Sequence, residues 1–189
     1  MDEIDRKIIS QLQLDGRTTL EKLAEITGLS NTGVKKRLSK LVQKDMVKVS
    51  ALVNVKHLNL QAAIMLMEVE SSEALNRLID RFRKCPRVVN LFTTLGGYNL
   101  VALVVAEDRN TLESISMEKC SLRSDEGVRR SEFYPISDVY YSPFIQLRER
   151  LTHMDHTITP CDVDCGPCHR YRIEKCVGCP TTTYYRGQL

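Results

Sequence analysis

The sequence contains no tryptophan, and aromatic residues fill only 6% of its 189 positions, so its cores must be built from aliphatic side chains. It lacks any apolar run near the about 20 residues that a helix needs to cross a bilayer. Its acidic first residues, 1–5, lack the apolar segment of a secretory signal. Since 42% of the residues are apolar and 27% are charged, we expect a cytoplasmic globular protein with no membrane partner.

The sequence also lacks a large excess of either charge, because 27 basic and 24 acidic residues give a net charge of only +3. The basic excess lies in residues 1–59, which hold 11 basic and 7 acidic residues. No acidic residue lies between Glu25 and Asp45. That interval contains Lys35, Lys36, Arg37, Lys40 and Lys44. A local basic segment indicates nucleic-acid binding better than whole-chain charge does, although a solvated helix face is the alternative.

Three short helical patterns follow one another in residues 1–59, which we expect to form one domain. The apolar residues of the first pattern recur every four positions: Ile4, Ile8 and Leu12. Residues 18–21 are typical of a capping box, in which a Thr hydroxyl and a Glu carboxylate satisfy amides of a helix's first turn. Gly28 suits the end of this second helix, because glycine readily adopts the left-handed conformation.

The third pattern begins at Ser30, whose side chain can cap a helix. Its apolar face comprises Val34, Leu38, Leu41 and Val42. The connection before it is very short, as in helix-turn-helix units, and this leaves the polar face outermost. That face supplies the candidate DNA contacts Ser30, Asn31, Thr32, Lys35, Lys36, Arg37 and Lys40. We expect Asn31 and Thr32 to read base edges in a major groove and the cations to contact phosphates or bases.

Two features complete this first domain. Residues 46–49 and 52–55 alternate between apolar and polar, which predicts a β hairpin or wing. The alternative to DNA binding is a three-helix bundle that serves as a protein-interaction module. We favour double-stranded DNA as the partner, because the projecting third helix is also the basic one.

The middle of the chain, residues 60–140, predicts a second domain. Strands are expected at 62–70, 87–95, 98–106 and 127–136, and helices at 73–84 and 110–120. This β-α-β-β-α-β order is that of a ferredoxin-like α+β fold. Both helices would cover one face of the sheet and leave the other bare, with Met65 and Met67 on the bare face. A second copy could cover it, so we expect a homodimer or a higher even oligomer.

The C-terminal extension, residues 141–189, holds five of the seven cysteines. Ser142 and Pro143 are typical of a helix start and predict a short docking helix that runs from there to about His153. The five cysteines are the candidate metal ligands Cys161, Cys165, Cys168, Cys176 and Cys179. We interpret Cys85 and Cys120, which are isolated in sequence, as buried structural thiols.

Three states of the clustered cysteines stay open. Zinc would be held by the two Cys-x2-Cys pairs, which leaves Cys161 as a spare ligand. An iron–sulfur cluster could instead use Cys161, Cys165 and Cys168 with Cys176 or Cys179. Metal-free thiols or disulfides are the third possibility. A region with so few apolar residues needs a staple to fold, which favours a metal, and a fifth thiol would suit metal or redox sensing.

The first domain closely resembles the N-terminal domain of the Lrp/AsnC (leucine-responsive, feast/famine) transcription regulators. The resemblance is carried by residues 4–9, 14–17, 23–24 and 28–30, with Val34, Arg37 and Leu38. It covers about residues 1–140 and implies a dimeric DNA-binding regulator whose second domain binds effectors and assembles subunits. These proteins usually have glycine after the recognition helix; Asp45 stands here, and Asp tolerates the same turn.

The resemblance also points to an effector site. Gly96, Gly97, Tyr98 and Asn99 stand where relatives commonly have Gly-Asp-Tyr-Asp, in a loop that contacts amino-acid effectors at a subunit interface. Gly97 and Asn99 replace both carboxylates, so a ligand's ammonium group would have fewer charged partners here. The alternative is that the two glycines make a hairpin turn and Tyr98 packs.

Two other functions compete with the regulator. Siroheme decarboxylase subunits share this two-domain plan, so the fold itself does not exclude catalysis. His57 is the only histidine before residue 153, however, and we see no acid–base constellation, so we do not expect an enzyme. The other competitor is a metallochaperone or redox protein that merely retains the helix-turn-helix.

Overall fold

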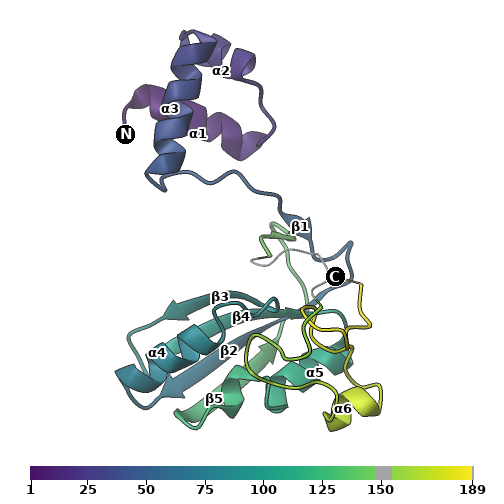
Figure 1. Ribbon diagram of the computed structural model, residues 1–189. Coiled ribbons are helices and arrows are strands. Elements are labelled where there is room, and N and C mark those ends of the chain that lie inside the picture. Colours follow the sequence, from purple (N-terminus) through teal and green to yellow (C-terminus); the bar gives the residue numbers. More distant parts are fainter. Residues whose placement is uncertain (148–154, 189) are drawn as a thin grey trace. The chain divides into compact units, whose positions relative to one another are not determined.

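The computed structural model describes residues 1–147 and 155–188 (Figure 1). The chain divides into two compact units, Met1–Ala51 and Leu52–Leu189. We expected the first boundary after residue 59 and a separate third domain from residue 141. The division instead falls after Ala51, because residues 53–54 pair with residues 144–145, and the described part of the extension packs within the second unit.

The first unit contains three helices, as predicted. They are α1 (Glu3–Leu14), α2 (Leu20–Thr27) and α3 (Asn31–Gln43). Thr19, and not Thr18, caps α2 by accepting the backbone N–H of Lys22, so the predicted capping box is one residue out of place. Gly28 ends this helix with a left-handed φ of 72°, and Ser30 caps α3 by accepting the backbone N–H of Gly33 at 3.2 Å.

The core of the first unit is aliphatic. Its buried residues are Ile8, Leu23, Val34 and Leu41. Val42, which we expected in this core, is 46% exposed, because it lies one residue past Leu41 and points away from α1 and α2. Asp45 adopts a left-handed φ of 51°, as expected for the residue that takes the usual glycine position after the third helix.

The predicted wing is wrong. Residues 46–51 are described and form no strand; the strand that follows is the two-residue β1 (Val53–Asn54). Its antiparallel partner is β6 (Phe144–Ile145), far along the chain. The docking helix predicted from Ser142 is therefore wrong at its start, because Phe144 already lies in a strand. Its expected end near His153 lies outside the described residues.

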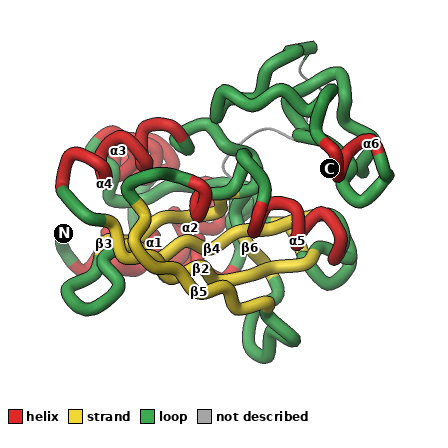
Figure 2. Tube along the Cα trace, turned by 90° about the horizontal axis from the view of Figure 1, so that it is seen from below, coloured by secondary structure: helices red, strands yellow, loops and turns green. Residues whose placement is uncertain are grey.

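The second unit contains the predicted ferredoxin-like fold. Its elements are β2 (Gln61–Val69), α4 (Ser72–Arg81), β3 (Val88–Thr93), β4 (Leu100–Ala106), α5 (Arg109–Met117), the 3-10 turn η1 (Leu122–Ser124) and β5 (Val128–Pro135). The strands form one antiparallel sheet in the order β3-β4-β2-β5. Figures 1 and 2 show α4 and α5 on the same side of this sheet.

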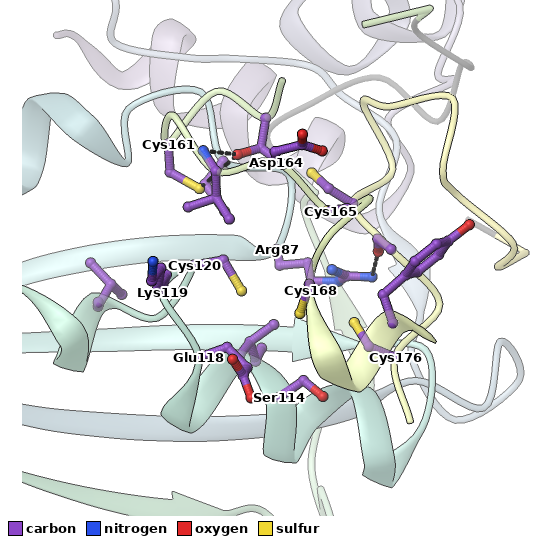
Figure 3. A pocket seen from close by; sticks show the side chains of 18 of the residues that line it. Arg87, Ser114, Glu118, Lys119, Cys120, Cys161, Asp164, Cys165, Cys168 and Cys176 are labelled. Atoms are coloured by element: carbon purple, nitrogen blue, oxygen red, sulfur yellow. Dashed lines mark hydrogen bonds between the residues drawn. The ribbon is translucent and has the colours of Figure 1, made fainter. Parts of the chain in front are cut away.

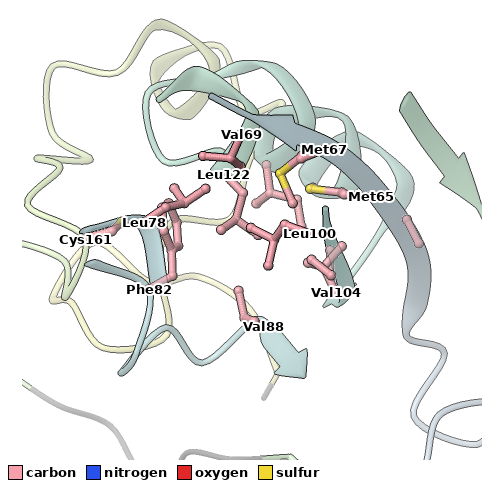
Figure 4. Close-up of a cluster of buried hydrophobic side chains, with 14 of the residues drawn as sticks. Met65, Met67, Val69, Leu78, Phe82, Val88, Leu100, Val104, Leu122 and Cys161 are labelled. Carbon is pink, nitrogen blue, oxygen red and sulfur yellow. The ribbon is translucent and has the colours of Figure 1, made fainter. Parts of the chain in front are cut away.

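Alternation along β2 decides which side chains form the core. Met65 and Met67 point toward the helices and pack among Leu78, Phe82 and Leu100 (Figure 4). We expected these two methionines on the bare face, and that assignment is wrong by one residue. The bare face instead presents the alternate positions of the strands, with Ile64 exposed.

The cysteine-rich tail, residues 155–188, packs on the ferredoxin-like fold. It contains the short helix α6 (His169–Arg172). Ser114 of α5 donates to the carbonyl of Lys175 at 2.8 Å and accepts from Nε of Arg170 at 2.7 Å. Within the described residues, no helix is both long enough and apolar enough to cross a membrane.

Candidate DNA-binding helix and cysteine-lined cavity

Helix α3 exposes the face that we predicted would contact DNA. The exposed residues of that face are Asn31, Thr32, Lys35, Lys36, Ser39 and Lys40. Val34 and Leu41 fix the opposite face in the core. Lys36 and Lys40 are four residues apart and therefore lie on one stripe of the helix. The Ser30 hydroxyl accepts the bond that caps the helix, and its O–H can still donate at the N-terminal turn.

Arg37 has partners that the sequence did not indicate. Its Nη1 atom lies 2.6 Å from Oδ2 of Asp2 and 3.0 Å from Oδ1 of Asp5. Hydrogen bonding to Asp2 and then to Asp5 raises the pKa of Arg37, and the bonds that Asp2 accepts from the Asp5 backbone and Arg37 lower the pKa of Asp2. Arg37 therefore joins α3 to the start of α1. Of the seven predicted DNA contacts, it is the one whose charge is already paired.

One cavity of about 440 Å³ in the second unit is lined by all seven cysteines. Figure 3 labels five of them: Cys120, Cys161, Cys165, Cys168 and Cys176. Cys85 comes from the segment before β3 and Cys120 from the segment after α5. The five others come from the tail: Cys161, Cys165, Cys168, Cys176 and Cys179. All seven are thiols in the structure. Cys85 and Cys120 are partly buried against the core of the fold, so the predicted burial holds only in part, and they are not isolated in space.

The thiols line the wall of the cavity and do not meet at one point. Within residues 1–147 and 155–188, no three His, Cys, Asp or Glu side chains are close enough together to hold one metal ion. Burial, and then the neighbouring Cys161 and Cys179, raise the pKa of Cys85 to about 12. Burial likewise raises the pKa of Cys165 to about 11. These groups are neutral thiols at pH 7, and any metal must displace their protons.

Arg87 is a buried cation on the same cavity wall. Its guanidinium forms a bidentate pair with Glu107, with an Nη2–Oε1 distance of 2.9 Å and an Nε–Oε2 distance of 3.1 Å. Nη2 also donates to the carbonyl of Gly178 at 2.5 Å. Burial acts to lower the pKa of Arg87, but the charge of Glu107 outweighs this and the pKa is raised. The bond from Arg87 to Gly178 therefore holds the tail against the ends of β3 and β4.

Comparison with known proteins agrees with both folded units. Residues 1–42 match the AsnC-type helix-turn-helix domain, and residues 62–142 match the Lrp/AsnC ligand binding domain. The HTH-type transcriptional regulator FL11 of Pyrococcus furiosus is 30% identical over 132 residues, which span 67% of this chain and 85% of that protein. The chain belongs to the Lrp/AsnC family of transcriptional regulators.

Solved Lrp/AsnC structures share the fold. The leucine response regulatory protein LrpA of Mycobacterium tuberculosis superposes with a TM-score of 0.65 at 26% identity, over 78% of this chain and 99% of that one. The regulator NMB0573 of Neisseria meningitidis, solved as its L-Met complex, superposes with a TM-score of 0.66 at 24% identity, over 75% and 94%. The cysteine-rich tail lies beyond both matched Lrp/AsnC domains.

The predicted effector residues lie between β3 and β4 of the Lrp/AsnC ligand binding domain. Gly96 and Gly97 are exposed, and neither has a positive φ, so the turn does not use the conformation that favours glycine. The Asn99 side chain is engaged internally, because Oδ1 accepts the backbone N–H of Val69 at 2.7 Å and Nδ2 donates to its carbonyl at 2.8 Å. The amide therefore extends the pairing of strands β2 and β4.

Tyr98 is also held within the fold. Its hydroxyl donates to Glu132 on β5, and the guanidinium of Arg130 lies 4.5 Å from the centre of its ring. The hydrogen bond to Glu132 raises the pKa of Tyr98. Sequence reasoning missed Arg130 and Glu132, since only the sheet register places them beside the loop; in that register Glu132 lies opposite Leu66 on β2.

Proposed function

We propose that this Lrp/AsnC regulator binds specific DNA sites through α3. The observation that supports this most directly is the division of α3 into a fixed face and a free one. Val34 and Leu41 are buried, while Lys35, Lys36 and Lys40 are exposed. A rigid helix with a cationic outer face matches the requirement of a major groove lined by phosphates.

Each residue then has a distinct part. Lys35, Lys36 and Lys40 contact phosphates and set the position of the helix, while Asn31 and Thr32 at its N-terminal turn read base edges. Arg37 also positions the helix, because its Nη1 atom is bound by two carboxylates, and its contact with DNA stays a prediction. Ser30 supports the same turn as its cap.

Removing Lys36 and Lys40 together tests this proposal. The Lys36→Ala/Lys40→Ala variant should bind its operator more weakly, and the plot of log affinity against log salt should become shallower by about 2, or about one unit for each lost phosphate contact. The control is Lys7→Ala/Lys22→Ala, which removes the same charge from α1 and α2. Anisotropy titrations at several salt concentrations measure both slopes.

The control separates contact from overall charge. If α3 carries the interface, only the α3 variant changes the slope, while both variants keep the same circular dichroism spectrum. An α3 slope equal to that of the unmodified protein, or equal changes in the two variants, would refute the assignment of α3.

We also propose a two-fold dimer, or a higher even oligomer built from it. The bare face of the sheet exposes aromatic side chains, with Phe92 50% and Tyr134 51% exposed, beside Ile64. Pairing this face with a second copy would cover it and present two α3 helices to a pseudo-palindromic site.

The small-molecule effector site at residues 96–99 stays a prediction. The domain's similarity to the Neisseria protein solved with L-Met supports a small ligand. Gly97 and Asn99 offer no carboxylate, and the Asn99 amide is occupied by Val69, so we favour a ligand without a free ammonium group.

We propose no catalytic role for the chain. The relatives that it matches are named transcriptional regulators. His57, the histidine that a siroheme decarboxylase-like enzyme would need, is exposed between β1 and β2. A regulator must reach DNA, so we also propose a cytoplasmic location.

A further inference from the structure

All of the cysteines of the chain converge on one place. Three separate segments bring them there: the residues before β3, the residues after α5 and the tail. Packing alone gives no reason for every thiol in a sequence of 189 residues to line the same cavity. Thiolates are the ligands of choice for soft transition metals and for iron–sulfur clusters.

Cys85 stands out among the thiols of the ferredoxin-like fold. Arg87, two residues after Cys85, donates from Nη2 to the carbonyl of Gly178 at 2.5 Å, and Gly178 directly precedes Cys179. This contact brings the segment that carries Cys85 beside a cysteine of the tail. Cys85 also lines the same cavity as Cys161 and Cys179 of the tail.

Size and charge favour a cluster over one zinc ion. Zinc needs four ligands about 2.3 Å from a single point, whereas here the thiols are spread over the wall of a cavity of about 440 Å³. A cluster takes one thiolate per iron and so accepts ligands that are further apart. Its core with four thiolates is anionic, and the buried Arg87 supplies a cation near Cys176 and Cys179.

We propose that this cavity holds an iron–sulfur cluster whose thiolate ligands come from both the tail and the ferredoxin-like fold, with Cys85 as the ligand from the fold. Each ligating thiol releases its proton to solvent as its sulfur bonds an iron atom, and the iron and sulfide come from outside the chain. The site does not depend on DNA binding, because its residues belong to the second unit alone.

The test uses the full chain, purified without oxygen and reconstituted with ferric iron, sulfide and a thiol reductant, which reduces part of the iron to the ferrous state. The expected product is brown, absorbs near about 400 nm and contains roughly four irons and four sulfides per chain. Cys85→Ser should lose at least half of the iron and most of the absorption. Val69→Ala, a change at a buried position of the same domain that does not line the cavity, should keep both.

Clear outcomes would overturn the proposal. Colourless protein that carries zinc, or protein that takes up no iron on reconstitution, would reject the cluster. Full iron content in Cys85→Ser would reject Cys85 as a ligand. Should that variant fail to fold by circular dichroism, the unmodified chain still decides the cluster, because a reduced cluster gives a paramagnetic resonance signal that bound zinc or adventitious ferrous iron does not.

Discussion

Replacing Arg87 by Met should destabilise the second unit more than any single surface change. The side chains of Arg87 and Glu107 are only 7% and 8% exposed, and the guanidinium binds both the carboxylate and the Gly178 carbonyl. Methionine fills much of the same volume but leaves Glu107 buried without its counter-charge. Stranding one partner of a buried pair costs about 3–5 kcal/mol of unfolding free energy.

The magnitude can be checked by thermal unfolding. A loss of about 3–5 kcal/mol in a unit of this size lowers Tm by roughly 10–15 °C. The matched control is Arg83→Met, which breaks the surface pair with Asp80, where the two side chains are 70% and 64% exposed. Exposed pairs contribute about 0–1 kcal/mol, so the control should shift Tm by only a few degrees.

A double variant separates the pair from its packing. Arg87→Met/Glu107→Leu removes both charges, and it should recover much of the lost stability because no unpaired ion remains in the interior. The reasoning fails if Arg87→Met is no more destabilising than Arg83→Met, or if the double variant is as unstable as the two single changes added together.

Two further predictions concern the sheet. Asn99→Ala leaves the N–H and carbonyl of Val69 without their side-chain partner and should cost about 1–3 kcal/mol in urea unfolding. Asn76→Ala, at an exposed position of α4, should cost little, and equal costs would count against the structural role of Asn99. Ile64→Glu should shift the proposed dimer toward monomer in light scattering, whereas Met117→Glu, on the exposed side of α5, should not; an unchanged mass for Ile64→Glu would exclude the bare face as the interface.

Local sequence signals predicted the helices and strands well. The caps at Ser30 and Gly28 fixed the ends of α2 and α3, because each rests on a bond or a conformation within one turn. The wing and the docking helix failed for the opposite reason. Strand β1 is only two residues long and pairs with residues 144–145. A local sequence pattern cannot predict a strand partner that lies about 90 positions away.

Side-chain direction was harder to predict than secondary structure. Along β2 every residue is apolar from Ala62 to Met67, so the sequence shows no alternation that could tell the core face from the bare one. The partners of Arg37 and the gathering of Cys85 with the tail cysteines are likewise set by tertiary packing. The residue types show that these side chains can form ion pairs or bind metals, but only the tertiary structure shows that they lie together.

The pairing of β1 with β6 has a mechanical consequence. The backbone that follows the DNA-binding unit and the backbone that leads into the tail are tied to each other, by the strand pair, by the N–H of Val55 bound to the Pro143 carbonyl at 2.9 Å, and by the Lys56–Asp138 ion pair at 2.6 Å. Because these contacts join the two segments, a displacement of one strand also displaces the other. A change in the backbone at residues 144–145 is therefore transmitted through hydrogen bonds to residues 53–55, the segment at which the second unit begins.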